Sequence, residues 1–414
     1  MSVAALRAEA RALFDAGLRA ADPGPAVQRA IEGGAPAFAA AGGRRIVVSV
    51  GKAGVAMAQA ALRALPSGPV EALVVTNDGN ARPLPGATVL AAGHPVPDAR
   101  GAEAADRVEA LLRGAGAGDR VIALISGGGS ALLPAPVPGV SLRDKGAVTR
   151  LMLAAGMDIT AMNAVRQHLS RLKGGGFLRA ADPAPVTALI LSDVIGDDLR
   201  VIASGPTVAP IATAAEVAAD LRARGLWDRL PPAVRAHLDQ ATAAPPLPPA
   251  TNVLIGSNGL SLAAMARAAR RPGTRIAGDR LTGDVAEAAA AILAAARTAP
   301  RPACLLWGGE TTVTLRGRGL GGRNQELALR VALAGLPGDW AFLSGGTDGR
   351  DGPTAAAGGI VDGGSAARMR AAGVDPGARL ADNDSHRALA ASGDLLVTGA
   401  TGTNVADLQV LVLG

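Results

Sequence analysis

Short runs of apolar residues alternate along this chain with longer stretches that suit helices. In the first half these runs occupy residues 45–50, 72–76, 121–125 and 186–191, with a further candidate at 87–90. Helical spacing of apolar residues lies between them, as at residues 100–113. Strands that are apolar on both faces belong in a sheet that helices cover on both sides. The alternation therefore predicts an α/β fold with a mainly parallel sheet.

The same pattern starts again after a proline-rich stretch. This stretch begins at Pro231 and Pro232 and ends at residues 245–249, and the short segment between them ends at residues 242–244. The whole stretch is the best candidate for a linker or surface crossover. Beyond it, apolar runs at 252–255, 303–307, 341–343 and 409–413 alternate with helical stretches at 260–269 and 285–296. Residues 311–315 follow a tight Gly-Glu turn, which predicts an antiparallel strand pair.

Composition excludes several classes of protein. Hydrophobic residues make up 49% of the chain, which excludes a wholly disordered protein, and aromatic residues make up 2%, too few for a nucleic-acid binder built on stacked rings. The net charge of +6 is spread without a basic block, which favours small anions over DNA. The single cysteine, Cys304, allows no internal disulfide. Because residues 1–22 are charged and long apolar runs are interrupted, we expect a cytoplasmic protein without a membrane or nucleic-acid partner.

Two strand-to-helix junctions in the first half carry groups that suit an anion. One is the loop formed by Ser126, Gly127, Gly128, Gly129 and Ser130. Glycines let main-chain N–H groups turn toward an anion, and a helix that follows adds its positive end. The other is Lys52, which follows the strand at 45–50 without the remaining residues of a Walker A loop. The alternatives are a plain turn and a solvated lysine.

A second glycine-rich loop, residues 317–322, matches the G-x-G-x-x-G spacing. On its own this is a weak dinucleotide signal, and the acid expected at the end of the next strand is misplaced, because Asp339 lies at that strand's beginning. Arg323 follows the loop at the start of a predicted helix. A guanidinium beside free helix N–H groups suits a phosphate or carboxylate. Gly321, Gly322, Arg323 and Asn324 are therefore candidates for anion binding, with a solvated arginine as the alternative.

Carboxylates follow several of the predicted strands. They include Asp193, Glu310 and Asp348. Such residues often only cap helices or turn the chain. Several strand ends that each deliver a carboxylate also suit Mg²⁺, which takes one or two carboxylates together with phosphates and waters.

The densest basic segment is residues 163–176, where Asn163, Arg166 and Ser170 share one helical face and Lys173 precedes three glycines. A salt-bridged surface face is the alternative to an anion-facing helix. Histidines are few, and neither a zinc hydrolase motif nor a thiol enzyme is supported by their spacing.

Together these segments resemble the class II glycerate 2-kinases, a family with a C-terminal MOFRL domain. The matching segments follow family order over nearly the entire chain, at residues 50–53, 93–98, 126–132, 163–175, 192–197, 203–207, 308–310, 321–326, 346–352, 383–385 and 401–405. As a set they are specific, whereas each alone is weak. The chain departs from the family pattern at His386, which stands where an aromatic residue is common, and at Ala400, which stands where proline is usual.

The resemblance implies transfer of the γ-phosphoryl group of ATP to the 2-hydroxyl of D-glycerate, with Mg²⁺ as cofactor. It implies a Rossmann-like domain over residues 1–242, on whose partner domain the first helix could pack, and a mixed-sheet MOFRL-type domain over residues 250–414, with the active site in the cleft between the two domains. Lys52 and Arg323 match the family's proposed catalytic cations. A homodimer is left open.

The remaining roles are assigned by the chemistry that phosphoryl transfer needs. Asp193 is a catalytic candidate, and Asp193, Glu310 and Asp348 can hold Mg²⁺ or orient the hydroxyl. Arg166, Lys173 and His94 are candidates for contact with glycerate. The competing function is a hydroxypyruvate reductase that uses a nicotinamide cofactor, a label that this family has also carried.

Overall fold

The computed structural model describes residues 1–39, 42–241 and 245–414, and residues 242–244 of the expected linker lie outside this part. Two compact units are present. The parallel-sheet unit comprises Pro23–Ser192 and Asp197–Ile255, and the mixed-sheet unit comprises Met1–Asp22, Asp193–Gly196 and Gly256–Gly414. The domain limits taken from the sequence stay a prediction, because the chain passes between the units more than once.

The parallel-sheet unit is built on six strands in the order β3-β2-β1-β4-β5-β6. Their bounds are β1 (Arg45–Val50), β2 (Val70–Asn77), β3 (Thr88–Ala92), β4 (Arg120–Ile125), β5 (Val186–Leu191) and β6 (Ala250–Gly256). Strands β1 to β5 pair in parallel. Every residue of β1 and β5 is buried, as the apolar runs predict. In this strand order the direction of winding reverses between β1 and β4, the place where doubly wound sheets bind ligands.

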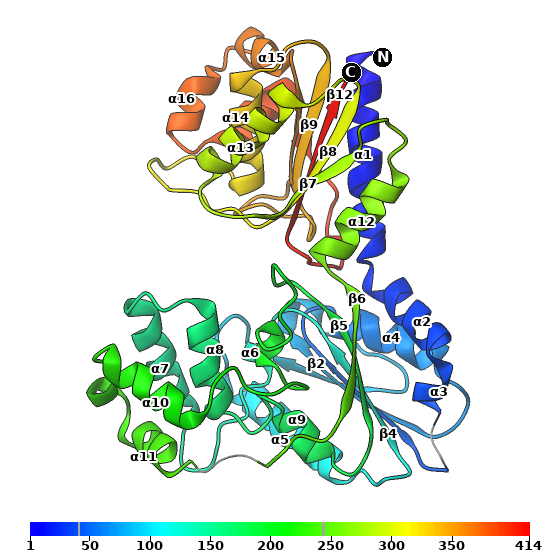
Figure 1. Cartoon of the computed structure of the whole chain (residues 1–414), viewed down its shortest axis with the longest axis vertical. Coiled ribbons are helices and arrows are strands. Elements are labelled where there is room, and N and C mark those ends of the chain that lie inside the picture. The colour runs from blue at the N-terminus through cyan, green and yellow to red at the C-terminus, as the bar shows by residue number, and fades with distance from the viewer. Residues whose placement is uncertain (40–41, 242–244) are drawn as a thin grey trace. The chain divides into compact units, whose positions relative to one another are not determined.

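Helices cover this sheet and form a separate cluster beside it (Figure 1). Those that complete the sheet layers are α2 (Pro23–Gly33), α3 (Ala35–Phe38), α4 (Gly54–Ala64), α5 (Ala99–Arg113), α6 (Gly129–Leu132) and α9 (Gly176–Ala181). The cluster consists of α7 (Leu142–Ala154), α8 (Ile159–His168), α10 (Ala214–Ala223) and α11 (Pro232–Gln240), which share a core of aliphatic and methionine side chains. Capping boxes fix the starts of α7 and α10, through Ser141 with Asp144 and Thr213 with Glu216.

The mixed-sheet unit also contains six strands, in the order β11-β10-β9-β12-β8-β7. Their bounds are β7 (Arg275–Leu281), β8 (Ala303–Gly309), β9 (Trp340–Gly346), β10 (Gly358–Asp362), β11 (Leu395–Leu396) and β12 (Asp407–Leu413). Only β7 and β8 pair in parallel, and the other neighbours are antiparallel. The predicted α/β fold, with a mainly parallel first sheet and a mixed second sheet, is confirmed.

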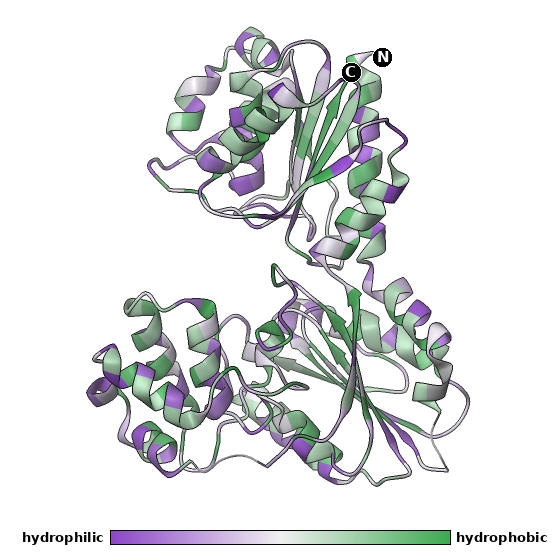
Figure 2. Cartoon of the chain, in the orientation of Figure 1, coloured by the Kyte–Doolittle hydropathy of each residue, from purple (hydrophilic) through white to green (hydrophobic). Residues whose placement is uncertain are grey.

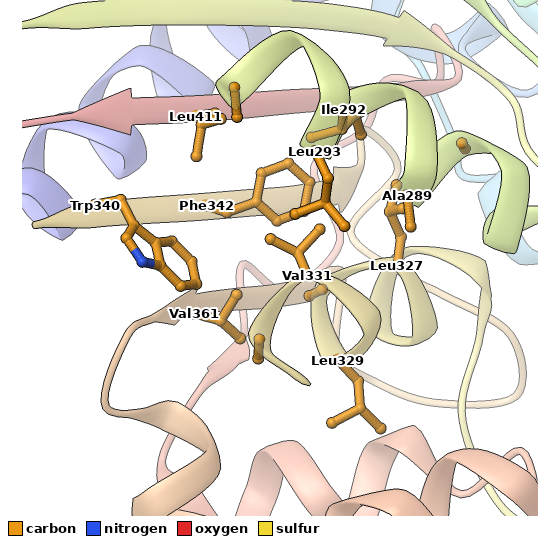
Figure 3. Close-up of a cluster of buried hydrophobic side chains, with 14 of the residues drawn as sticks. Ala289, Ile292, Leu293, Leu327, Leu329, Val331, Trp340, Phe342, Val361 and Leu411 are labelled. Carbon is orange, nitrogen blue, oxygen red and sulfur yellow. The ribbon is translucent and has the colours of Figure 1, made fainter. Parts of the chain in front are cut away.

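Both faces of the mixed sheet are covered by helices (Figure 1). On one face, α13 (Val285–Thr298) and α14 (Arg323–Ala334) pack on the sheet around Trp340 and Phe342, the core shown in Figure 3. On the other face, α1 (Val3–Ala20) and α12 (Asn258–Ala268) bury Leu6, Phe14 and Leu262. The remaining helices are α15 (Ser365–Ala371), α16 (Pro376–Ala381) and α17 (Ser385–Ser392). Figure 2 shows that the central strands of both sheets are mainly hydrophobic.

Two sequence predictions of local structure are wrong. Residues 311–315 form no strand, and Thr312 makes only an isolated parallel bridge with Asp284. The reason is that both edges of β8 are occupied, by β7 on one side and by β12 on the other. The basic helix also ends early, at His168, because Ser170 forms a bridge with Pro136 and the chain then turns through left-handed glycines. Among the described residues no helix is long and apolar enough to cross a membrane.

Candidate active site

Strands β1 and β4 are neighbours, and the loops that leave their carboxyl ends form the centre of the site. Lys52 follows β1, and its main-chain N–H donates to the oxygen of Gly127 in the loop after β4, at 2.9 Å. Gly51 has a φ of +125°, and a side chain there would collide with Ser126. Gly128 has a φ of +88°, and a Cβ there would lie 3.0 Å from the His94 ring and 3.4 Å from Lys52 Cγ. Lys52, His94 and the loop of residues 126–130 are therefore brought together.

The glycine loop after β4 presents unused hydrogen-bond donors. In the described part of the chain no group accepts from the main-chain N–H of Gly127, Gly128, Gly129 or Ser130. Buried N–H groups are normally satisfied, so successive unused donors suit a ligand with several acceptor oxygens. The Ser126 hydroxyl is different, because it is buried, accepts from the N–H of Ala53 at 3.2 Å and contacts the oxygen of Val50 at 3.4 Å. Ser126 thus fixes the loop.

His94 lies against this loop as a neutral ring. Burial lowers the pKa of His94, and the positive charge of Lys52 lowers it further. A histidine with a depressed pKa remains neutral at pH 7, so it offers a hydrogen-bond donor and an acceptor but no charge. The positive charge beside Gly128 is therefore that of Lys52.

Lys173 supports the loop from inside the protein. Its ammonium donates to the main-chain oxygens of Ser130 and Leu133, at 2.9 and 2.7 Å, and the side chain is buried. Burial lowers the pKa of Lys173 to about 7, and the nearby charge of Arg166 contributes. Since at least two of its donors hold the chain itself, Lys173 is placed as a support, and a direct contact with glycerate stays a prediction.

Arg166 is a cation of this region without a counter-ion among the described residues. It lies on α8, half-buried, and burial lowers its pKa. No hydrogen bond or ion pair joins its guanidinium to any residue that the structure describes. Its charge is felt by Lys173 and by a half-buried lysine, Lys145, whose ammonium donates to the oxygens of Pro134 and Leu169. A half-buried guanidinium without a counter-ion suits a carboxylate or phosphate, and the assignment of Arg166 to glycerate stays a prediction.

The mixed-sheet unit supplies the other predicted cation, Arg323, at the start of α14. Its Nε and Nη2 atoms donate to both carboxylate oxygens of Asp407, at 2.6 and 3.0 Å. Its Nη2 also lies 3.1 Å from Glu310. Burial alone would lower the pKa of Arg323, but the hydrogen bonds and charge of Asp407 outweigh it and raise that pKa. The guanidinium is one-third exposed while Asp407 is fully buried, so the pair holds a permanent cation at the surface of the unit.

Carboxylates gather around Arg323. Burial raises the pKa of Glu310, Arg323 opposes this, and the charges of Asp407, Asp193 and Asp348 raise it again. These carboxylates are therefore close enough to interact electrostatically. Among the described residues, however, no three or more acidic, histidine or cysteine side chains are arranged as a set of metal ligands. The assignment of Asp193, Glu310 and Asp348 to a metal stays a prediction.

The helix N-terminus behind Arg323 is already occupied. Asp351 accepts from the main-chain N–H groups of Asn324 and Gln325, at 3.1 and 2.8 Å. Gly322 allows this, because a side chain there would collide with the Asp351 carboxylate. The Asn324 side chain is also used, since its oxygen accepts from Ser344 at 2.6 Å. The N–H group of Asn324 is thus served by Asp351, and the assignment of Gly321, Gly322 and Asn324 to phosphate binding stays a prediction.

The G-x-G-x-x-G loop is likewise filled by the chain itself. Its main-chain N–H groups donate to side chains of the Asp382–Asp384 segment, from Arg316 and Gly317 to Asn383, from Arg318 to Asp382 and from Leu320 to Asp384. The glycines are required because side chains at residues 317 and 319 would collide with the same segment, and those at residues 321 and 322 with Ser385 and Asp351. No strand precedes the loop, so it lacks the strand–loop–helix setting of a dinucleotide site.

Known proteins agree with this organisation. Residues 9–239 match the domain family DUF4147, described as a domain of unknown function, and residues 303–407 match the MOFRL family. The D-glycerate 2-kinase of Thermotoga maritima is 41% identical over 89% of this chain and 90% of its own length. This chain belongs to the MOFRL-domain glycerate kinase family.

A solved structure and a further relative extend the comparison for this member of the MOFRL-domain glycerate kinase family. A crystal structure of a glycerate kinase from Thermotoga maritima superposes with a TM-score of 0.91 at 38% identity, over 99% of this chain and all of that chain. A protein of Agrobacterium vitis that is named as a hydroxypyruvate reductase is 43% identical over 98% of this chain and 94% of its own length. The family resemblance read from the sequence is confirmed.

Sequence reasoning missed several residues of this glycerate kinase family site. Asp407 was passed over, although a lone carboxylate at the start of the apolar strand β12 signals a partner, since buried charges are paired. Asp351 lies within a matched segment but received no role. Ser204, which contacts Ser130, was hidden because the two are 74 positions apart.

Proposed function

We propose that this protein is a glycerate 2-kinase, which transfers the γ-phosphoryl group of ATP to the 2-hydroxyl of D-glycerate and yields 2-phosphoglycerate and ADP. The observation that carries the proposal is the loop of residues 126–130, whose unused N–H groups lie beside Lys52 at the reversal point of a doubly wound sheet. The relatives named as glycerate kinases supply the substrate class.

Phosphoryl transfer depends on positioning and on stabilisation of negative charge. Here the N–H groups after β4 bind phosphate oxygens, while the ammonium of Lys52 and the guanidinium of Arg323 stabilise charge on the transferred group. Arg166 binds the carboxylate of glycerate, because its charge is half-buried and unpaired among the described residues. Asp193 orients the 2-hydroxyl and accepts its proton as the oxygen attacks phosphorus.

The donor set around Arg323 fits a magnesium ion. Mg²⁺ takes oxygen ligands and usually binds through one or two protein carboxylates together with substrate phosphates, so a cage of three is not needed. Asp193, Glu310 and Asp348 are the residues that would hold it. When bound, the ion neutralises charge on the nucleotide phosphates. We expect turnover to vanish with EDTA and to return with Mg²⁺ or Mn²⁺, and full turnover in metal-free buffer would contradict this assignment.

The decisive experiment is to incubate the purified protein with ATP, Mg²⁺ and D-glycerate and to follow ADP. Phosphorus NMR then distinguishes 2-phosphoglycerate from 3-phosphoglycerate. Arg323→Ala is the control, and we expect it to lower kcat by about 10²–10³-fold, as for loss of one donor to transition-state charge. Absence of ADP, or formation of the 3-phosphate, would refute the proposal.

The alternative, hydroxypyruvate reduction, is favoured only by the name of the Agrobacterium vitis relative. It requires a nicotinamide site, and in the G-x-G-x-x-G loop the N–H groups of residues 317–320 are already taken by residues 382–384. Steady oxidation of NADH in the presence of hydroxypyruvate would establish this function instead.

A further inference from the structure

A chain of three hydrogen-bonded side chains ends at the glycine loop. The hydroxyl of Ser204 donates to the side-chain oxygen of Asn163 at 2.9 Å. The same hydroxyl lies 2.9 Å from the hydroxyl of Ser130. Asn163 and Ser204 are buried, with 2% and 0% of their surface exposed, whereas Ser130 is half-buried beside the unused N–H groups of the loop.

This arrangement fixes the direction of the hydrogen bond between Ser130 and Ser204. A hydroxyl has a single proton to donate, and an amide oxygen can only accept. Ser204 gives its proton to Asn163, so its oxygen must accept in the bond with Ser130. The proton of Ser130 is therefore used inside the protein, and the oxygen of Ser130 presents only lone pairs to a ligand.

The backbone around Ser204 holds its hydroxyl in the position in which it accepts from Ser130. Ala203 and Ser204 have φ values of 50° and 61°, in the left-handed region that residues other than glycine rarely adopt. The carbonyl oxygen of Ser204 accepts from the Gln167 side chain at 3.2 Å and from the N–H of Gly174 at 3.1 Å. Backbone strain that neighbours maintain in this way is a feature of functional sites.

We infer that Ser130 is a specificity residue that accepts a hydrogen bond from the 3-hydroxyl of the bound hydroxy acid. The inference rests on the proposed function, and it replaces the phosphate-binding role that the sequence suggested for this hydroxyl. Phosphate oxygens are also acceptors, so their lone pairs would repel those of the Ser130 oxygen. The 2-hydroxyl must lose its proton to a base during transfer, and a neutral serine with its own proton in use is a poor base. The 3-hydroxyl keeps its proton throughout the reaction, so it is the donor that matches the Ser130 oxygen.

The test measures binding separately from catalysis. Titration calorimetry gives Kd for D-glycerate and for D-lactate, which lacks the 3-hydroxyl, with the wild type and with Ser130→Ala. We expect Ser130→Ala to weaken D-glycerate binding about three- to tenfold, the effect of one neutral hydrogen bond, and to leave D-lactate binding unchanged. Ser204→Ala, which removes the acceptor of the Ser130 proton, should also reduce the preference for D-glycerate. Ser170→Ala is the matched control, since Ser170 is a nearby buried serine whose hydroxyl has no hydrogen-bond partner among the described residues.

The outcomes are distinct. An equal loss of affinity for both acids in Ser130→Ala would show that Ser130 only maintains the loop, and a rise in KM for ATP with an unchanged preference for D-glycerate would show that it contacts the nucleotide. Either result overturns the inference. If the wild type binds D-glycerate but forms no ADP, the kinase proposal fails, while the preference of the binding site for a 3-hydroxyl is still measured.

Discussion

Replacement of Asp407 by asparagine isolates the partner that positions Arg323. Asp407 opens β12, is fully buried, and accepts from both Nε and Nη2 of Arg323. Asparagine keeps the size of the side chain but turns one acceptor into an NH₂ donor, which then faces an N–H of the guanidinium. The change therefore removes the charge and one of the two hydrogen bonds that orient Arg323.

The magnitude follows from the exposure of the pair. A well-oriented donor to transition-state charge is worth about 2.7–4 kcal/mol, and Asp407 orients Arg323 for that role. Arg323 is one-third exposed and keeps Glu310 at 3.1 Å, so solvent and Glu310 compensate part of this loss. We therefore expect a loss of about 2–3 kcal/mol of transition-state stabilisation, which corresponds to about 30- to 150-fold in kcat/KM. The fully buried position also implies a lower melting temperature.

The assay compares Asp407→Asn in two backgrounds. If Asp407 acts through Arg323, the substitution should lower kcat/KM strongly in the wild type but little in Arg323→Ala. Added guanidinium ion should partly restore Arg323→Ala, and this rescue should be lost in the double variant, because the carboxylate that binds guanidinium is gone. An equal loss in both backgrounds, or rescue that does not depend on Asp407, would refute the reasoning and leave Asp407 as a residue that only stabilises the fold.

Three other predictions concern residues of the candidate site. Arg166→Gln should raise KM for D-glycerate at least about tenfold with KM for ATP unchanged, because a hydrogen bond to a charged group is lost, and steady-state kinetics with each substrate varied will check this. Asp351→Ala should lower the free energy of unfolding by about 1–3 kcal/mol, since it leaves the N–H groups of Asn324 and Gln325 unpaired, and an unchanged denaturation midpoint would contradict it. The folded pKa of Lys173, about 7, lies below that of an unfolded lysine, so the unfolded state binds more protons above pH 7. The wild type should therefore gain stability relative to Lys173→Met as pH rises from 7 toward about 10, by at most about 1.4 kcal/mol per unit, and a flat difference would mean that Lys173 titrates normally.

The strands were predictable where both of their faces are buried. β1 and β5 begin and end at the residues that the apolar runs indicate, because a continuous apolar segment has few other places to go. Residues 311–315 show the limit of this reasoning. Their alternation suits a half-exposed strand, but pairing depends on a free edge, and β12 occupies the edge of β8 from nearly a hundred positions away. Local pattern carries no information about that competition.

The candidate site was predictable to the level of its loops. Glycines and charges that follow apolar strands located Lys52, residues 126–130, Glu310 and Arg323. The sequence could not show which N–H groups are already used, since the partners that use them, Asp351 and Asn383, come 26 to 67 positions later in the chain. The sequence also could not show which of the basic residues already have hydrogen-bond partners within the protein. Lys173 and Arg166 belong to one basic segment, yet the ammonium of Lys173 is bonded to main-chain oxygens, while the guanidinium of Arg166 has no partner among the described residues.

The two glycine-rich loops show why composition alone does not define an anion site. Both are rich in glycine and both precede a helix, but most N–H groups of the loop of residues 317–322 and of the helix start behind it donate to side-chain or main-chain oxygens of the chain. The loop of residues 126–130 keeps its N–H groups unused in the described structure, so they are available to the phosphate that we propose it binds. Because the proton of Ser130 is also used internally, we propose that the main chain and Lys52 supply the attraction for phosphate in this loop. The serine hydroxyl is thereby free to act as an acceptor, so one loop can bind an anion and recognise a hydroxyl with different atoms.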